Sequence, residues 1–369
     1  EILGTKSWTG VSLFSAVTKS TLWTMDNSST CSVAFANTDA DAAKELIMGD
    51  CQFGHVTIYD ATKSDFTVKT QLNTIELGAL SVAAGDVDND GITEVIWSAG
   101  QSHSGEDILA VGEIDGSGTV WNSNQLDWFV GLGFTQIAPG DKRAVFLAPR
   151  TESGYSGQEL VLMSESGELQ TSKVLSDNAE GGDSGVVLDY NGDGYAEALI
   201  ASSRYYDSYA QVIKLSDFSQ LWSSAQSSDS GAMTTVLTAD INSDGHDDAL
   251  YVSNGKIVIN DLYSETLLHV IDTGASYIYD VTVLDKNNAP SLIVASNQGL
   301  SLWSKDSHGT YLNVVSNSTL CKRIAAGKIG ASGNLQIACV DAEYYSSNED
   351  RLITFDANLN QQDTFTLSG

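Results

Sequence analysis

The chain has 369 residues and carries 48 acidic against 18 basic side chains, which gives a formal net charge of −30. This charge repels nucleic-acid backbones and anionic bilayers, so neither is expected as an electrostatic partner. Hydrophobic residues make up 42% of the chain, enough for a large core, and 33 glycines against three prolines favour turn-rich β structure and exclude a collagen or a coiled coil.

A nine-residue acidic motif recurs along the chain, and we number its positions 1 to 9. Asp, Asn or Glu occupies positions 1, 3, 5 and 9, glycine occupies position 6, and an apolar stretch follows. Full copies start at Asp86, Asp189 and Asp240. A weaker copy starts at Asn37 and has Ala42 in place of the glycine.

Degenerate copies fill the gaps between the motifs and divide the chain into seven similar units. Residues 137–147, 285–294 and 328–337 keep the strand–turn–strand outline with few or none of the acids. Each unit has an apolar strand before the loop, a second strand after it, a third alternating strand and a more polar fourth. Four short strands in roughly 40–50 residues are typical of a propeller blade. Predicted first strands are 80–84, 184–188 and 234–238, predicted third strands are 55–59, 211–215 and 299–303, and a predicted fourth strand is 219–222.

The first residues of the chain look like part of a further blade. Residues 1–4 and 10–14 align with residues 45–48 and 54–58, so the chain begins at the second strand of a unit. We therefore predict an all-β propeller with eight blades, one of them incomplete, in preference to seven blades with a hairpin outside the ring. Residues 1–369 are predicted to form a single domain, and no apolar run approaches the ~20 residues that a membrane span requires.

The four cysteines occupy matching places in two units. In each unit one cysteine precedes the acidic loop at the start of the first strand, and the other follows it at the end of the second. An antiparallel hairpin brings these two points together. Of the three possible pairings we therefore predict Cys31–Cys51 and Cys321–Cys339. Two disulfides imply an oxidising compartment, so we expect a secreted or cell-surface location, and the sequence starts without a signal peptide, as expected of a mature chain or an excised fragment.

The acidic loops predict calcium sites. Carboxylates at alternate positions of a tight loop point into one concavity, glycine at position 6 permits the turn, and oxygen ligands of this number suit Ca²⁺. Solvated acidic turns are the alternative, but three copies at one place in a repeat argue against it. The weak loop, with Asn37, Asp39, Asp41 and Glu45, is expected to bind weakly or not at all. In the full loops the predicted ligands are Asp86, Asp88, Asp90, Ile92 and Glu94, then Asp189, Asn191, Asp193, Tyr195 and Glu197, then Asp240, Asn242, Asp244, His246 and Asp248, with the position-7 residues contributing their carbonyls.

These loops resemble the FG-GAP and VCBS repeats of integrin-α-type β-propellers. The resemblance rests on the three full motifs and, as a repeat, covers nearly the whole chain. It implies Ca²⁺ bound between the first two strands of a blade, and a role in cell adhesion as in bacterial biofilm-matrix adhesins and propeller lectins. The Phe-Gly…Gly-Ala-Pro signature does not occur, so the similarity to animal integrins is remote.

A ligand is expected on the propeller face opposite the acidic loops. Loops between second and third strands and links between blades lie there, and several carry aromatic residues beside Asp, Asn or Arg. Such groups offer a sugar ring a stacking face and partners for its hydroxyls. The alternative is that these aromatic residues pack between blades. The candidate ligand-binding residues are Arg204, Tyr205, Tyr206, Asp207, Tyr209, Trp128, Tyr155, Tyr344 and Tyr345.

The sequence favours a binding scaffold over an enzyme. We predict a secreted, calcium-stabilised, non-catalytic propeller that binds a glycan or matrix polysaccharide in a biofilm matrix or on a cell surface. One alternative is a polysaccharide lyase, with His103, Arg204 and Tyr205 as acid and base candidates. Another is a scaffold for a second extracellular protein. No phosphate loop, dinucleotide fingerprint or nucleophile elbow occurs.

Overall fold

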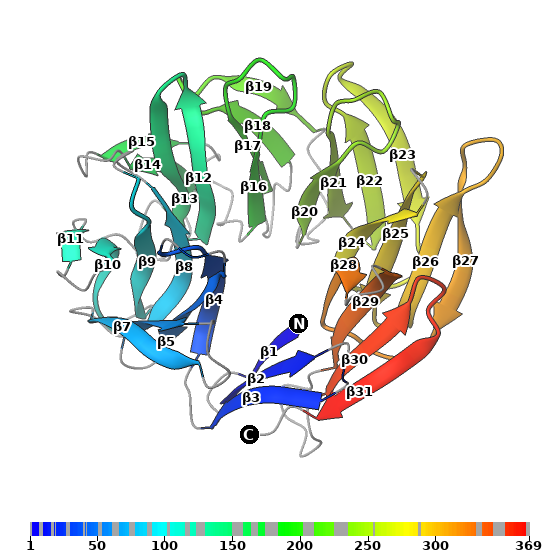
Figure 1. Cartoon of the computed structure of the whole chain (residues 1–369). Coiled ribbons are helices and arrows are strands. Elements are labelled where there is room, and N and C mark those ends of the chain that lie inside the picture. Colours follow the sequence, from blue (N-terminus) through cyan, green and yellow to red (C-terminus); the bar gives the residue numbers. More distant parts are fainter. Residues whose placement is uncertain are drawn as a thin grey trace. The chain divides into compact units, whose positions relative to one another are not determined.

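The structure is a computed structural model of the whole chain (Figure 1). It describes residues 2–6, 10–15, 18, 20–26, 30–39, 41, 43–50, 54–60, 66–73, 78–86, 91–101, 104–114, 119–122, 130–149, 158–163, 169–173, 184–201, 210–224, 235–253, 255–286, 289–329, 334–341 and 351–366. Within these ranges the regular elements are all strands, and none of the described segments is a helix suited to crossing a membrane.

The strands form eight antiparallel sheets, and contacts divide the chain into two compact units. Unit 2, Ser28–Met233, holds four sheets of four strands each. Their strands are β4 (Thr30–Ala36), β5 (Glu45–Asp50), β6 (His55–Asp60) and β7 (Thr67–Asn73); β8 (Ala79–Gly85), β9 (Glu94–Gln101), β10 (Ser104–Glu113) and β11 (Thr119–Asn122); β12 (Val130–Ala138), β13 (Asp141–Pro149), β14 (Gln158–Met163) and β15 (Leu169–Lys173); β16 (Ser184–Leu188), β17 (Glu197–Ala201), β18 (Ala210–Lys214) and β19 (Gln220–Ser223).

Unit 1 consists of Glu1–Asn27 and Thr234–Gly369 and holds the other four sheets. One has three strands, β1 (Ile2–Lys6), β2 (Gly10–Ser15) and β3 (Ser20–Asp26). The others are β20 (Val236–Ala239), β21 (Asp248–Ser253), β22 (Lys256–Asp261) and β23 (Thr266–Asp272); β24 (Ile278–Lys286), β25 (Ala289–Ser296), β26 (Gly299–Lys305) and β27 (Tyr311–Asn317); β28 (Arg323–Ile329), β29 (Asn334–Asp341), β30 (Arg351–Asp356) and β31 (Gln361–Thr366).

This arrangement matches the predicted repeat of seven complete four-stranded units and one unit of three strands. In every sheet the strands pair in chain order, as in a propeller blade. Within unit 2 the first strands β4, β8, β12 and β16 follow one another as neighbours, as Figure 1 shows. All described acidic loops therefore connect a first strand to a second strand.

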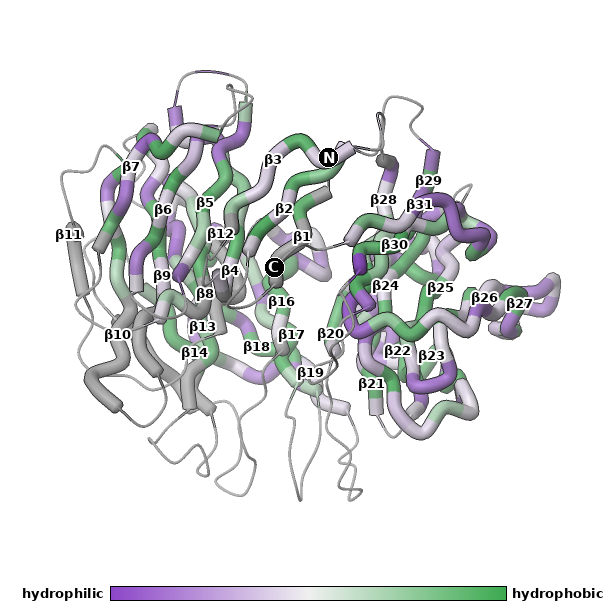
Figure 2. The backbone as a smooth tube through the Cα atoms, turned by 90° about the horizontal axis from the view of Figure 1, so that it is seen from below, coloured by the Kyte–Doolittle hydropathy of each residue, from purple (hydrophilic) through white to green (hydrophobic). Residues whose placement is uncertain are grey.

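The core lies between neighbouring sheets and uses their second and third strands most. β17 is buried along its whole length and β25 along most of it, whereas the fourth strands β27 and β31 are largely exposed and carry hydrophilic residues (Figure 2). In unit 2, one cluster joins Leu162 of β14 to Ile200 of β17. In unit 1, Phe14 of β2 lies 4.8 Å from Phe365 of β31 between ring centroids. Each such buried side chain contributes about 1.5–3 kcal/mol.

A β-bulge recurs where the third strand meets the fourth. In seven of the eight described sheets the register skips one residue of the last strand, which is β3 in the three-stranded sheet and the fourth strand in the others. Such a bulge leaves one residue unpaired and redirects its side chain. The skipped residues are Leu22, Lys69, Val120, Leu221, Leu268, Val314 and Gln362.

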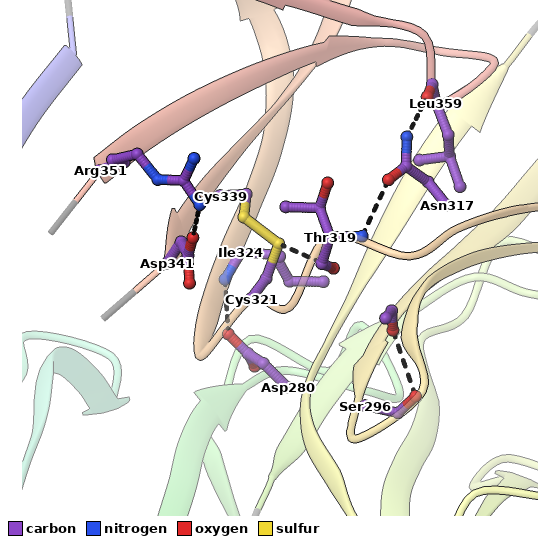
Figure 3. Close-up of a disulfide and its surroundings, with 11 residues drawn as sticks. Asp280, Ser296, Asn317, Thr319, Cys321, Ile324, Cys339, Asp341, Arg351 and Leu359 are labelled. Atoms are coloured by element: carbon purple, nitrogen blue, oxygen red, sulfur yellow. Dashed lines mark hydrogen bonds and ion pairs between the residues drawn. A yellow bond between two sulfur atoms is a disulfide. The ribbon is translucent and has the colours of Figure 1, made fainter. Parts of the chain in front are cut away.

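The structure contains the predicted Cys321–Cys339 disulfide (Figure 3). Cys339 lies in β29, Cys321 lies two residues before β28, and both are fully buried in an apolar cluster. The Lys322 N–H donates to the Val340 carbonyl at 2.8 Å, so the hairpin brings the two cysteines together as expected. Cys51 of the predicted Cys31–Cys51 pair lies outside the described residues, so this disulfide stays a prediction.

Candidate metal-binding loops

Four acidic loops connect the first and second strands of their sheets, at 37–45, 86–94, 189–197 and 240–248. In every one the acid at position 9 is the first residue of the second strand. These acids are Glu45, Glu94, Glu197 and Asp248, and none is more than 3% exposed. A carboxylate is rarely buried to this extent without a partner for its charge.

The loop at 189–197 wraps its backbone around the acidic side chains. The Asp189 carboxylate accepts the N–H of Asp193 at 3.1 Å and that of Gly194 at 3.0 Å. Asn191 Oδ1 also accepts the Asp193 N–H, at 2.9 Å, and Asp193 Oδ1 accepts the N–H of Tyr195 at 2.8 Å. Positions 1, 3 and 5 therefore turn their side chains toward one another, as their spacing predicts.

The loop at 240–248 repeats this geometry. Asp240 accepts the N–H groups of positions 5 and 6 at 3.1 and 3.0 Å. Asn242 accepts the position-5 N–H at 2.9 Å, and Asp244 accepts the position-7 N–H at 2.9 Å. Two loops with different residues between the acids have the same fold because the acids and the glycine determine it.

Glycine at position 6 lies in the left-handed region in all three full loops. The φ angles are 89° at Gly91, 83° at Gly194 and 91° at Gly245. Residues with a Cβ adopt these angles only at a cost, so the sequence requirement for glycine has a direct structural cause. Position 4 is also left-handed in two loops, at Gly192 and Ser243.

Burial makes the position-9 acids unusual. It raises the pKa of Glu197 to about 7, and the charges of Asp193 and Asp189 add to the rise while the Tyr190 N–H opposes it. Burial likewise raises the pKa of Asp248 to about 6, although Asp248 Oδ2 accepts the N–H of Ile241 at 2.8 Å. The described protein groups therefore compensate the ionised form of each acid only in part.

The loop at 86–94 is described at both ends. Asp86 follows β8, Ile92 is half exposed, and Glu94 starts β9 in a buried position. Lys142 Nζ of β13 lies 3.9 Å from Asp86 Oδ2. The other two predicted ligands, Asp88 and Asp90, lie outside the described residues.

The weak loop also gathers its acids. Single oxygen atoms of Asp39, Asp41 and Glu45 all lie within 4.8 Å of one another. Glu45 Oε2 accepts the Thr38 N–H at 2.7 Å, and Asp41 Oδ1 accepts the Ala43 N–H at 2.7 Å. The bond from position 5 to position 7 is therefore common to three loops.

Groups that the motif does not include hold the loops to neighbouring strands. Thr93 Oγ1 donates to the Asn37 carbonyl at 3.0 Å, and Lys305 Nζ of β26 donates to the Ile241 carbonyl at 3.0 Å. Both contacts join consecutive sheets within one unit. The sequence does not predict these donors, because each belongs to a different repeat from the loop that it contacts. Only Thr93 could have been singled out, since it lies inside the next acidic motif.

Unit 1 also contains a half-open cavity of about 320 Å³ beside β23 and β26. Its walls include His269, Trp303, His308 and Tyr311, and the His269 ring meets the Tyr311 ring edge-on at 5.1 Å. Lys305 Nζ lies 5.5 Å from the Tyr311 ring centroid. The cavity thus combines aromatic and polar walls near the loop at 240–248.

The predicted ligand-binding residues lie outside the described residues. This holds for the cluster from Arg204 to Tyr209 and for the aromatic candidates in other blades, so their role in ligand binding stays a prediction. The residues concerned are Arg204, Tyr205, Tyr206, Asp207, Tyr209, Trp128, Tyr155, Tyr344 and Tyr345.

The described loop residues fit a hard divalent cation. Each proposed ligand position offers the metal an oxygen atom. The buried atoms Asp248 Oδ1 and Asp86 Oδ1 accept no hydrogen bond within the described part of the chain. A Ca²⁺ ion takes six to eight oxygen ligands and tolerates irregular geometry. Such an ion would place a positive charge beside the buried carboxylates and so compensate their negative charge.

Comparison with known proteins places a repeat family within this fold. Residues 78–122 match the FG-GAP repeat, a segment that contains the four strands β8 to β11, and FG-GAP repeats often bind Ca²⁺. This match confirms the resemblance found in the sequence. No curated protein matches the chain.

Solved structures show the architecture. The chain is similar to the Dos1 propeller (TM-score 0.59, 9% identity, 85% of this chain and 76% of that one). It is also similar to Sqt1 of Saccharomyces cerevisiae (TM-score 0.64, 11% identity, 91% of this chain and 85% of that one). A third similar structure is the exotype rhamnogalacturonan lyase YesX (TM-score 0.56, 14% identity, 89% of this chain and 66% of that one). At these identities the similarity shows the fold alone, which is a β-propeller of seven to eight blades.

Proposed function

We propose that this chain is a secreted β-propeller whose acidic loops bind Ca²⁺ and whose role is non-catalytic binding. The observation that carries the proposal is the shared geometry of the loops at 189–197 and 240–248. Each brings carboxylate and amide oxygens together and ends on a buried acid with a raised pKa. The third full loop belongs to the FG-GAP match.

Calcium would act as a structural ion at these loops. Positions 1, 3, 5 and 9 supply side-chain oxygens, position 7 supplies a carbonyl, and the bound ion neutralises the buried acid at the start of the second strand. An ion that binds only the folded state stabilises it by mass action. The ion therefore holds the first two strands of a blade together and keeps the scaffold rigid.

Removal of calcium tests this role. The melting temperature of the chain in excess Ca²⁺ is compared with that in excess EDTA, with Mg²⁺ as a control for non-specific divalent binding. We expect EDTA to lower the melting temperature by about 5–15 °C, because several sites each contribute. Identical curves in EDTA and Ca²⁺ would contradict the proposal.

A carbohydrate is the partner that the proposal favours. The reasons are the Tyr-rich loops of the predicted ligand face and a described cavity with aromatic and polar walls. A secreted location agrees with the Cys321–Cys339 disulfide. The net charge of −30 favours neutral over acidic polysaccharides, because like charges repel.

A glycan-binding screen in Ca²⁺ tests the partner. Binding to neutral glycans without turnover would support the scaffold, and the variants Tyr205→Ala and His308→Ala would separate the predicted ligand face from the cavity. Release of unsaturated products from acidic polysaccharides, measured by ultraviolet absorbance, would instead identify a lyase. Absence of any glycan binding would favour a protein partner.

A further inference from the structure

The weak loop at 37–45 has as many carboxylates at the motif positions as two of the full loops. Asp39, Asp41 and Glu45 contribute three carboxylates, and the loops at 189–197 and 240–248 also have three at the motif positions. Oxygen atoms of the three acids lie within 4.8 Å of one another. Carboxylates at this distance repel one another unless a cation lies between or beside them.

A lysine of the same sheet supplies that cation. Lys69 Nζ of β7 lies 2.8 Å from Asp39 Oδ2, 3.1 Å from Thr38 Oγ1 and 3.3 Å from the Thr38 carbonyl. Thr38 Oγ1 in turn donates to the buried Glu45 Oε2 at 2.8 Å. One ammonium group therefore contacts three loop oxygens and is linked through Thr38 to the acid at position 9.

The recurring bulge accounts for the position of this lysine. Lys69 is the residue that the register skips between β6 and β7. Five of the other six skipped residues are Leu or Val, and the sixth is Gln362. A bulge redirects the side chain of its extra residue, so a lysine at this position can reach the loop.

In the sheets of the two fully described full loops, the skipped residues are Leu221 and Leu268. The lysines that act near these loops lie on third strands, Lys214 on β18 and Lys305 on β26. Lys214 lies over the Tyr195 ring, 4.9 Å from its centroid, and Lys305 donates to the Ile241 carbonyl. These lysines thus contact a ring and a backbone oxygen, where Lys69 contacts a side-chain carboxylate.

The weak loop has also lost two features of the full motif. Position 1 is Asn37, whose Oδ1 accepts the Asp39 N–H and whose Nδ2 donates to the Asp41 carbonyl, so a neutral amide stands where the full loops have a carboxylate. Position 6 is Ala42, which lacks the access of glycine to positive φ. Both changes weaken an oxygen cage, and neither hinders the contact with an ammonium group.

We infer that Lys69 takes the place of the metal ion in the loop at 37–45, so that this blade folds without calcium. The inference rests on the proposed function, since it distinguishes this loop from loops that take Ca²⁺. It assigns the neutralisation of this loop's acids to one residue on the bulge of the fourth strand.

Hydrogen exchange of the second strands tests the inference. Backbone amides of β5, β17 and β21 are followed in Ca²⁺ and in EDTA, because exchange reports the opening of each strand separately. We expect chelation to lower protection about tenfold or more in β17 and β21 and less than about twofold in β5. An equal loss in β5 would overturn the inference.

Variants test the role of the lysine directly. Lys69→Met removes the charge but keeps the side-chain length, and Lys44→Met removes a lysine at position 8 of the same loop. In EDTA we expect Lys69→Met to lower β5 protection about tenfold and Lys44→Met to change it less than about twofold. Unchanged β5 protection in Lys69→Met would overturn the inference.

The two proposals can fail separately. If β17 and β21 do not respond to chelation, the calcium proposal fails, and the Lys69→Met result still decides whether the lysine neutralises its loop. If β17 and β21 respond and β5 responds equally, the calcium proposal stands and the inference about Lys69 fails.

Discussion

The acid at position 9 belongs both to the loop and to the buried strand that follows it. Glu197 and Asp248 have no exposed surface, yet each begins a strand whose next residues form the core. Burial raises the pKa of Glu197 to about 7 and that of Asp248 to about 6. Their ionisation in the absence of metal therefore destabilises the folded chain.

This effect predicts an unusual pH dependence for the metal-free protein. Between the unfolded pKa of about 4 and the folded values, the folded state binds more protons than the unfolded state, so stability falls as pH rises. We expect the melting temperature in EDTA to fall between pH 5.5 and pH 8. The variant Glu197→Gln should reduce this fall, because a neutral amide replaces the titrating acid. A melting temperature that rises over this range in EDTA would contradict the prediction.

The glycine at position 6 provides a second test. Gly245 has a φ of 91°, and an added Cβ would meet no atom within 4 Å, so Gly245→Ala introduces backbone strain without a clash. We expect Gly245→Ala to lower the free energy of unfolding by about 1 kcal/mol and to weaken calcium binding. The control is Gly327→Ala, since Gly327 in β28 also has open space but no positive φ. Urea unfolding measures both, and equal stabilities would show that the left-handed turn is not required.

The strands and loops were predictable from the sequence because each depends on local pattern. The predicted strand 184–188 coincides with β16, and predicted strand 55–59 differs from β6 by one residue. The bulges were not predictable, because a bulge arises from the pairing of two strands. The alternation of polar and apolar residues within a single strand does not reveal it. The contact of Lys69 with Asp39 joins residues 30 positions apart and depends on that bulge. Spacing therefore identified the candidate ligands but not the groups that neutralise or anchor them.

The hairpin of β28 and β29 should depend on its disulfide. Cys321 and Cys339 are 18 positions apart and fully buried. A loop of this length gives a disulfide contribution of about 3 kcal/mol by the chain-entropy estimate. We expect the double variant Cys321→Ala, Cys339→Ala to lose about 2–4 kcal/mol in chemical unfolding. The wild-type chain in dithiothreitol is the control, and a double variant as stable as the oxidised wild type would contradict the prediction.

Acidic residues outside the loops add to the repulsion between negative charges in the folded chain. The net charge of −30 comes from 48 acids against 18 bases, so the folded chain repels itself along its length. Lysines near the described loops, such as Lys69 and Lys142, offset part of this repulsion where the acids are densest. Calcium at the remaining loops would offset more, which links the composition of the chain to the proposed calcium binding.

Salt should therefore replace part of the effect of calcium. Raising ionic strength from about 0.01 to 1 M shortens the screening length from about 30 to 3 Å and weakens repulsion between exposed acids. We expect NaCl to raise the melting temperature by several degrees in EDTA and much less in Ca²⁺, where the loops are already neutralised. Choline chloride is the control, because its cation is too large to enter an oxygen cage yet screens equally well. If NaCl stabilises the metal-free chain and choline chloride does not, the cause is sodium bound in the loops, and the argument from net charge is wrong.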